Sequence, residues 1–208
     1  MSNLPEGKVI KLKDVRLSFP ALDKATKTKG YEDDPNSPAM FRSGFLLDPK
    51  NPKHVAIIKA CNAEINRLIN EAWNGKPPKM EPITCFGKGE TQIRESGEVY
   101  DGYEGMYYVS ATNAKKPRRL SLQLEDLSDQ EALEKLYGGC YVTGSVNFWV
   151  QDNKHGKAIR CSLRGVQYKS EGEPFGVGAA SDDEFDNDDD LPAGDTSLGD
   201  DDFDDLDL

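Results

Sequence analysis

The sequence predicts a mainly β fold, a small antiparallel barrel or sandwich with two inserted helices and an acidic C-terminal tail. Three observations favour this class. Several segments alternate apolar and polar residues, which is the period of a strand that buries one face. Two other segments have the period of an amphipathic helix. The segments do not alternate strictly between strand and helix, which argues against a parallel sheet built from βαβ units.

The first strand is expected over residues 8–19, KVIKLKDVRLSF. Its apolar residues change faces part-way, which a β-bulge near Lys13 and Asp14 would explain. Residues 20–38 are rich in Pro, Lys, Asp and Gly and predict a long loop, and a second strand follows at residues 39–48, AMFRSGFLLD. The predicted loop carries three cations and one aromatic residue that are candidates for ligand binding: Lys24, Lys27, Lys29 and Tyr31.

A long helix is predicted for residues 51–75, where the apolar residues recur at helical spacing. Asn51 is expected to be the N-cap, and Gly75 is expected to end the helix. Trp73 lies in the apolar stripe, so we expect it to pack against the core rather than to stack on a base.

A strand is expected over residues 106–112, and a shorter helix at residues 128–139, SDQEALEKLYGG. Ser128 and Glu131 have the spacing of a capping box, in which each side chain bonds the backbone N–H of the other residue. Gly138 is expected to end the helix.

Two strands joined by the tight polar turn DNKHGK follow the second helix, and alternation sorts their side chains into two faces. In YVTGSVNFWVQ, Phe148 falls on the apolar side and Trp149 on the polar side. In the next strand Arg160 and Arg164 share the outward side. If the hairpin keeps a regular register, these two arginines flank Trp149 and Asn147 on one face of the sheet.

The strand at residues 106–112 adds a further outward aromatic residue, Tyr108, and is followed by KKPRR, the densest basic cluster of the chain. Outward aromatic residues interleaved with cations suit single-stranded nucleic acid, since bases stack on the rings and cations contact the phosphates. Each of these residues also has an alternative, purely structural explanation. Tyr108 and Trp149 would then cap a sheet under a loop or helix, and the basic residues would be solvated surface.

Charge is distributed unevenly along the chain. The net charge is −11, but residues 181–208 hold fourteen acids and no base, which leaves 23 acids against 26 Lys and Arg in the first 180 residues. Such a segment cannot bury enough apolar surface to offset the entropy of ordering, so we expect it to be disordered. We therefore predict a folded domain over residues 1–178 and a tail over residues 179–208.

The sequence carries no signal for a metal, a cofactor or catalysis. The four cysteines are widely spaced and are expected to be reduced core thiols. Phosphate-binding glycine loops and protease or hydrolase motifs are absent from the sequence, so we predict no cofactor and no enzymatic activity. No segment approaches the roughly 20 apolar residues of a membrane span, and we expect a soluble protein.

Three stretches resemble a family of bacteriophage proteins. They are FRSGFLLDP, GMYYVSATNAKKPRRLSL and LYGGCYVTGSVNFWVQDNKHGKAIRCSLRGVQYKSEGEPFGVG. The family was first catalogued as a domain of unknown function and is related to the single-stranded DNA-binding proteins of podoviruses. The resemblance covers nearly all of residues 8–178.

The resemblance implies an OB-fold barrel that acts in phage DNA replication and recombination in the cytoplasm of the infected bacterial host. It also implies that the tail contacts replication proteins, for which apolar residues among the acids are candidates: Phe185, Leu191, Phe203, Leu206 and Leu208. The loop between the first two strands would join the DNA site, because OB-folds commonly use it for oligonucleotides. The residues to which the resemblance adds weight are Tyr108, Lys115, Lys116, Arg118, Arg119, Trp149, Arg160 and Arg164, with Arg42 extending the same track.

Sequence-independent binding of single-stranded DNA is therefore the leading hypothesis, with a tail that competes with DNA and recruits replication proteins. An alternative is an acidic interaction module that mimics DNA and occupies a nucleic-acid-binding protein; it explains the charge of −11 but not the basic body. A third is a nuclease, in which Glu90, Glu98 and Asp101 would hold magnesium, although their spacing matches no nuclease motif.

Overall fold

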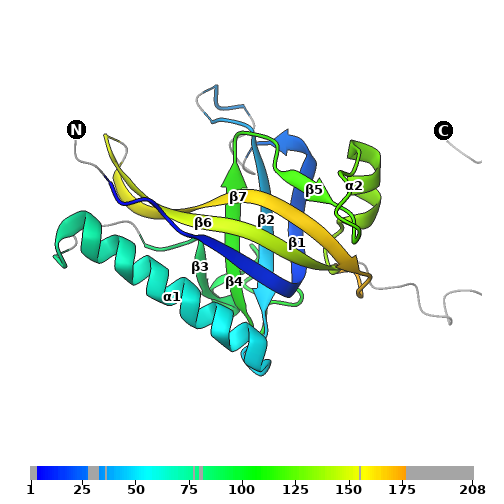
Figure 1. Ribbon diagram of the computed structural model, residues 1–208, viewed down its shortest axis with the longest axis horizontal. Coiled ribbons are helices and arrows are strands. Elements are labelled where there is room, and N and C mark those ends of the chain that lie inside the picture. The colour runs from blue at the N-terminus through cyan, green and yellow to red at the C-terminus, as the bar shows by residue number, and fades with distance from the viewer. Residues whose placement is uncertain are drawn as a thin grey trace, which may run out of the picture. The chain divides into compact units, whose positions relative to one another are not determined.

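The computed structural model (Figure 1) describes residues 4–27, 33–35, 37–76, 78–79, 82–154 and 156–176. The chain divides into two units, Met1–Gly176 and Val177–Leu208, and every described residue belongs to the first. The boundary predicted at residue 178 and the predicted disorder of the tail lie outside the described residues and stay predictions.

Five strands close into a barrel. They are β1 (Val9–Thr26), β2 (Met40–Leu47), β4 (Tyr107–Asn113), β6 (Tyr141–Asn153) and β7 (Gly156–Ser170). The sheet has the order β3-β4-β2-β1-β6-β7-β5, and a further pairing of β4 with β7 closes it. That closing contact is parallel and joins Thr112 to Ser162, whereas the other pairings within the barrel are antiparallel. The predicted OB-fold-like barrel with two inserted helices is confirmed (Figure 1).

Two short strands were not predicted. β3 (Phe86–Lys88) lies beside β4 and leads into the 3₁₀ turn η1 (Gly89–Thr91), and β5 (Arg118–Leu120) pairs in parallel with β7. Each has three residues, which is too short for alternation to be visible. Because β5 lies within the basic cluster, it fixes that cluster against the barrel.

β1 contains the predicted bulge and is longer than predicted. Its pairing with β6 shifts register between Leu12 and Val15, and Asp14 has a left-handed φ of 56°. The strand continues to Thr26, where it pairs with Met40 of β2. The prediction that Lys24 lies in a loop is therefore wrong, because a backbone ladder forms regardless of polar side chains when one face is open to solvent.

α1 (Pro52–Trp73) is the long predicted helix. The Asn51 side chain accepts a hydrogen bond from the Lys53 backbone N–H at 3.0 Å, so the predicted N-cap is confirmed. The helix ends at Asn74 in a left-handed conformation, one residue before the predicted stop. The indole Nε1 of Trp73 donates to Asp152 Oδ2 at 2.9 Å and its ring packs on the core, which confirms its structural role.

α2 (Asp129–Lys135) begins with the predicted capping box. The backbone N–H of Glu131 donates to Ser128 Oγ at 3.3 Å, and the Ser128 N–H donates to Glu131 Oε2 at 2.9 Å. The helix ends at Lys135, earlier than the predicted stop at Gly138, and packs against β1.

The core lies inside the barrel and under α1, with Phe45 and Phe148 among its largest fully buried side chains. The four cysteines are buried and unpaired, as predicted. Burial raises the pKa of Cys61, Cys85 and Cys140 to about 12, so these thiols stay protonated at neutral pH. Across the described ranges, no helix has the length and apolar character needed to span a membrane.

Candidate nucleic-acid interface

The outer face of β6 and β7 carries the predicted pairing of an aromatic residue with an arginine. Val142, Val146 and Phe148 point into the core, so the residues between them point outward. Trp149 is 38% exposed and lies directly opposite Arg160 in the hairpin register. The Arg160 Nε–H donates to Gln151 Oε1 at 3.2 Å, which orients the guanidinium along this face. The predicted orientation of both residues is confirmed.

A β-bulge moves Arg164 from its expected position. Ser145 pairs with Gly165, but Val146 pairs with Leu163, so Arg164 is the extra residue on β7. Asn147 lies opposite Ser162, as a regular register requires. The expected regular register is therefore confirmed from Trp149 to Val146, with Arg160 and Arg164 on either side of Ser162. Only beyond Val146 does the bulge shift the pairing, and it leaves Arg164 without the partner, Ser145, that a regular register would give it.

The displaced arginine lines a groove of about 400 Å³ on the outside of the barrel. Lys11 lies opposite Ser145 and Arg118 opposite Gly165, so β1 and β5 each bring a cation to the groove. Residues that line the groove include Lys11, Arg118, Leu124, Thr143, Ser145 and Arg164. Sequence reasoning missed Lys11, although its position next to the buried Leu12 in an alternating strand was the signal that it points outward.

Strand pairing extends this face around the barrel to β2. Arg42 lies opposite Thr112 of β4, Thr112 opposite Ser162 of β7, and Ser162 opposite Asn147 of β6. The Arg42 Nη2–H donates to the Thr26 carbonyl at 2.6 Å. This places the arginine next to the chain segment that carries Lys24, which is exposed, and Lys27. Arg42 is on this outer face of β2, and its place in a DNA-binding track stays a prediction.

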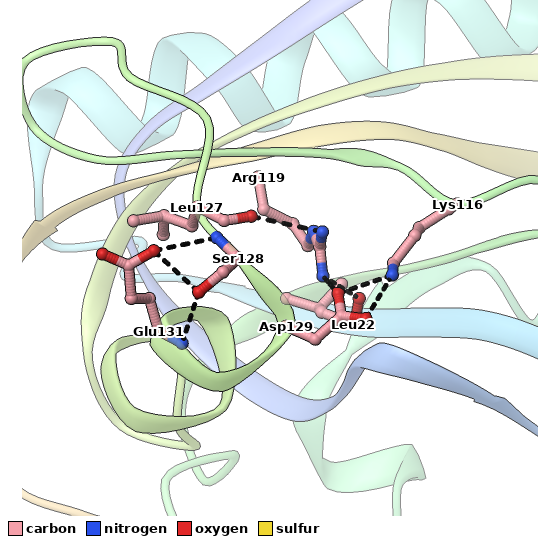
Figure 2. A network of polar contacts seen from close by, with 7 residues as sticks. All are labelled: Leu22, Lys116, Arg119, Leu127, Ser128, Asp129 and Glu131. Carbon is pink, nitrogen blue, oxygen red and sulfur yellow. Dashed lines mark hydrogen bonds and ion pairs between the residues drawn. The ribbon is translucent and has the colours of Figure 1, made fainter.

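The basic cluster is largely paired within the protein. Asp129, at the start of α2, accepts from Lys116 Nζ at 2.5 Å and from Arg119 Nη1 at 2.5 Å, as Figure 2 shows. Arg119 also donates to the carbonyls of Leu22 and Leu127, both at 3.2 Å, and its side chain is only 10% exposed. The expectation of a solvated Arg119 is wrong, because α2 brings a carboxylate to it.

The other two cations of the cluster, Arg118 and Lys115, are exposed. Arg118 pairs with Asp126 at 2.8 Å, but both side chains are about two-thirds exposed. The hydrogen bond from Arg118 lowers the pKa of Asp126, and the hydrogen bonds from Lys116 and Arg119 lower that of Asp129. Both carboxylates are therefore ionised at neutral pH. Lys115 is exposed and makes no ion pair with any residue in the described part of the chain.

Tyr108 is not available as an outward aromatic residue. Its side chain does point away from the barrel interior, but it is only 3% exposed. It packs with Leu46 and Tyr103, and its hydroxyl donates to the Thr84 carbonyl at 3.1 Å. The prediction that it is exposed is wrong, because the chain between β3 and β4 folds over this part of the sheet.

The carboxylates considered for a nuclease stabilise this covering chain. Glu90 accepts from the Gly105 N–H at 3.0 Å, Asp101 pairs with Arg94 at 2.7 Å, and Glu98 accepts from Ser96 at 3.2 Å. Within the described ranges, no group of three or more His, Cys, Asp or Glu could hold a metal ion.

Residues 8–195 match a protein-family model described as Enterobacter phage Enc34, ssDNA-binding protein. The chain belongs to this family. It is 35% identical, over 181 residues, to the protein p50 of Acyrthosiphon pisum secondary endosymbiont phage 1, an alignment that covers 86% of this chain and 92% of that protein. The predicted family resemblance is confirmed.

Two solved structures of the Enc34 family share this fold. One is the single-stranded DNA-binding protein from bacteriophage Enc34 in complex with ssDNA, with a TM-score of 0.67 and 30% identity over 81% of this chain and 89% of that chain. The other is the same phage's protein described without DNA, with a TM-score of 0.65 and 28% identity over 85% of this chain and 88% of that chain.

Seven predicted site residues lie outside the described residues: Lys29, Tyr31, Phe185, Leu191, Phe203, Leu206 and Leu208. The structure brings together Trp149, Arg160, Arg164 and Arg118, adds Lys11, and removes Tyr108 and most of Arg119 from the exposed face.

Proposed function

We propose that this protein binds single-stranded DNA without sequence preference on the outer face of β1, β6 and β7. The observation that carries the proposal is the exposed Trp149 ring opposite Arg160, on the same outer face of β6 and β7 as a groove lined by Lys11, Arg118 and Arg164. Aromatic rings stack on any base, whereas duplex DNA hides the base faces.

The dimensions of the face suit a short single strand. The six residue-to-residue steps from Thr143 to Trp149 span roughly 20 Å along β6. A cation lies at each end of this segment of β6. Arg160 is opposite Trp149, and Arg164 lines the same groove as Thr143. A track of this length fits the lower part of the range of about 4 to 16 nucleotides covered by single OB-folds.

The related Enc34 protein supports the proposal because it has been solved in complex with ssDNA. By this likeness we infer that the present protein has no enzymatic activity and acts in DNA replication and recombination in the cytoplasm of the infected bacterial cell. DNA-binding roles for Lys24, Lys27, Lys29, Tyr31, Arg42, Lys115 and Lys116 belong to the same proposal.

Fluorescence of Trp149 provides the direct test. The chain has two tryptophans, and Trp73 is hydrogen-bonded to Asp152 beneath the hairpin. Titrating the full-length protein with oligo(dT) in low salt is expected to quench the fluorescence. Quenching should persist in Trp73→Phe and disappear in Trp149→Phe. Absence of quenching and of any binding by the wild-type protein would contradict the proposal.

The acidic tail is proposed to compete with DNA for this face and to recruit replication proteins. Its fourteen acids are tethered to a domain with exposed cations, so their effective concentration at the groove is high. DNA binding would release the tail for partners, with Phe185, Leu191, Phe203, Leu206 and Leu208 as apolar anchors among the acids.

Replacing the acids of residues 181–208 by Asn and Gln in the full-length protein tests this competition. The affinity for oligo(dT) is expected to rise in low salt and to change little in high salt, because salt screens the competing charges. An unchanged affinity at every salt concentration would contradict the competition and leave recruitment as the tail's role.

A further inference from the structure

A second hollow, of about 660 Å³, lies outside the barrel and apart from the groove. It is bounded by the second half of β1, by the chain between β3 and β4, and by the segment that follows β7. Four aromatic rings line it: Phe19, Tyr100, Tyr103 and Phe175. Nothing in the proposed DNA site accounts for it.

Phe19 has an unusual backbone conformation at this hollow. Its backbone φ of 43° is left-handed, a conformation that is a genuine outlier for a bulky residue. Its side chain is nevertheless 56% exposed and meets Tyr100 edge-on, with 4.9 Å between ring centroids. Phe19 lies in the β-bulge between Ser18 and Ala21, where β1 shifts its register against β2, and the bulge turns the ring outward at the hollow.

Polar groups line the same hollow. Asp101 pairs with Arg94 Nη2 at 2.7 Å, and the Arg94 guanidinium lies 5.7 Å from the centroid of the Tyr100 ring. The Nε of Arg94 is buried and has no hydrogen-bond partner among the described residues. Glu95 and Ser96 lie on the same wall. The hollow therefore contains two carboxylates, and a donor with no partner among the described residues, beside an aromatic surface.

Arg16 connects this hollow to the proposed DNA face. It lies opposite Tyr141 in the pairing of β1 with β6, and Tyr141 is on the same face as Thr143, roughly 7 Å further along the strand. The Arg16 guanidinium lies 5.3 Å from the centroid of the Tyr141 ring and 4.5 Å from that of Phe175. A cation thus stands between the groove and the hollow.

We propose that the hollow takes one nucleobase of the bound strand, stacked on the exposed Phe19 ring, with the phosphates passing Arg16. The carboxylates of Asp101 and Glu95 disfavour phosphate inside the hollow, so the base and not the backbone enters. A carboxylate accepts a hydrogen bond from an exocyclic amino group, which cytosine has and thymine lacks. The hollow therefore prefers cytosine to thymine at one position of an otherwise sequence-tolerant site. This inference rests on the proposed function.

The test compares two oligonucleotides, all-dT and the same length with one central dC, on the full-length protein. A carboxylate contact to the cytosine amino group is expected to raise affinity about fivefold or more, the lower end of what a good base contact contributes. Phe19→Ala should abolish the difference. Leu133→Ala, a change at a side chain that is 66% exposed on α2 and lines neither cavity, should preserve it.

A second measurement follows stacking itself. With 2-aminopurine, an amino-bearing base, in place of the dC, its fluorescence is expected to be quenched on binding and to recover in Phe19→Ala. Phe19→Leu keeps the apolar bulk and removes the ring, so it should behave like Phe19→Ala, and a thermal melt shows that each variant is folded.

The outcomes separate the two proposals. Suppose that all-dT binds and quenches Trp149, but that neither the dC preference nor the 2-aminopurine quenching depends on Phe19. The hollow then binds no base, and the inference is overturned. It is also overturned if the hollow binds a peptide side chain instead of a base. If all-dT neither binds nor quenches Trp149, the proposed function itself fails.

Discussion

Two aromatic residues on the outer surface of the barrel each lie in a strand that alternates apolar and polar residues, but their exposure to solvent differs. On β6, Trp149 is 38% exposed beside cations. On β4, Tyr108 is 3% exposed beneath the chain that links β3 to β4. Both rings point away from the barrel interior. The open region can bind a ligand, whereas the covered region is a small second core.

The cover depends on close approach of Tyr103 to the sheet. Its hydroxyl lies 2.5 Å from Ser18 Oγ, and a Cβ on Gly44 would lie 2.9 Å from that hydroxyl. Only glycine leaves room for it here. Strand alternation therefore tells which face a side chain occupies, and the folding of the preceding loop decides whether that face meets solvent.

The largest expected effect comes from Tyr108→Ala. Removing a buried aromatic side chain should lower the free energy of unfolding by about 3 to 5 kcal/mol, measured by urea denaturation. The affinity for oligo(dT) should be unchanged under conditions in which the variant is folded. The opposite pattern, normal stability with lost binding, would show that Tyr108 belongs to the open face.

Alkaline pH should destabilise the covered region. Burial raises the pKa of Tyr103 to about 12, above the ordinary value near 10 in the unfolded chain. Between these values the folded protein retains a proton on Tyr103 that the unfolded chain has lost. Tyr103 therefore contributes a fall in stability of about 1.4 kcal/mol per pH unit as pH rises, in addition to the fall from the buried cysteines. Urea denaturation at pH 10 and 11.5 measures the slope, and Tyr103→Phe should reduce it. An equal slope in the variant would contradict the assignment.

Trp149→Ala should affect binding rather than stability. Loss of one stacking platform is expected to weaken oligo(dT) binding by about 1 to 3 kcal/mol, roughly 5- to 150-fold. The partly exposed ring contributes little to folding, so the urea midpoint should move little. Fluorescence anisotropy with labelled oligo(dT) measures the affinity. A large loss of stability with unchanged affinity would place Trp149 with Tyr108 as a structural residue.

A smaller effect is expected for the cation at the bulge. Arg164→Gln should reduce the slope of log affinity against log salt by about 0.7 in magnitude, the contribution of one phosphate contact on a single strand. Lys59→Gln on α1, away from the groove, is the matched control and should leave the slope unchanged. Equal slopes in both variants and the wild type would remove Arg164 from the DNA face.

Much of the fold could be predicted because its signals are local. The alternation around Trp149, the capping box of Ser128 and Glu131, and the N-cap at Asn51 involve residues within a few positions of one another. The same holds for the bulge near Asp14, where the change of apolar face is visible in one strand. Two three-residue strands escaped prediction because their pairing depends on partners far along the chain.

The site was predicted only in part, for the same reason. Sequence alone determined the strand faces, the caps, the buried cysteines and the separation of an acidic tail from a basic body, since these follow from local periodicity and composition. Tertiary structure decided that Asp129 neutralises Lys116 and Arg119, that a bulge redirects Arg164 into a groove with Lys11, and that Tyr103 covers Tyr108. Each of these depends on residues that meet only when the barrel closes, and no local pattern records such contacts.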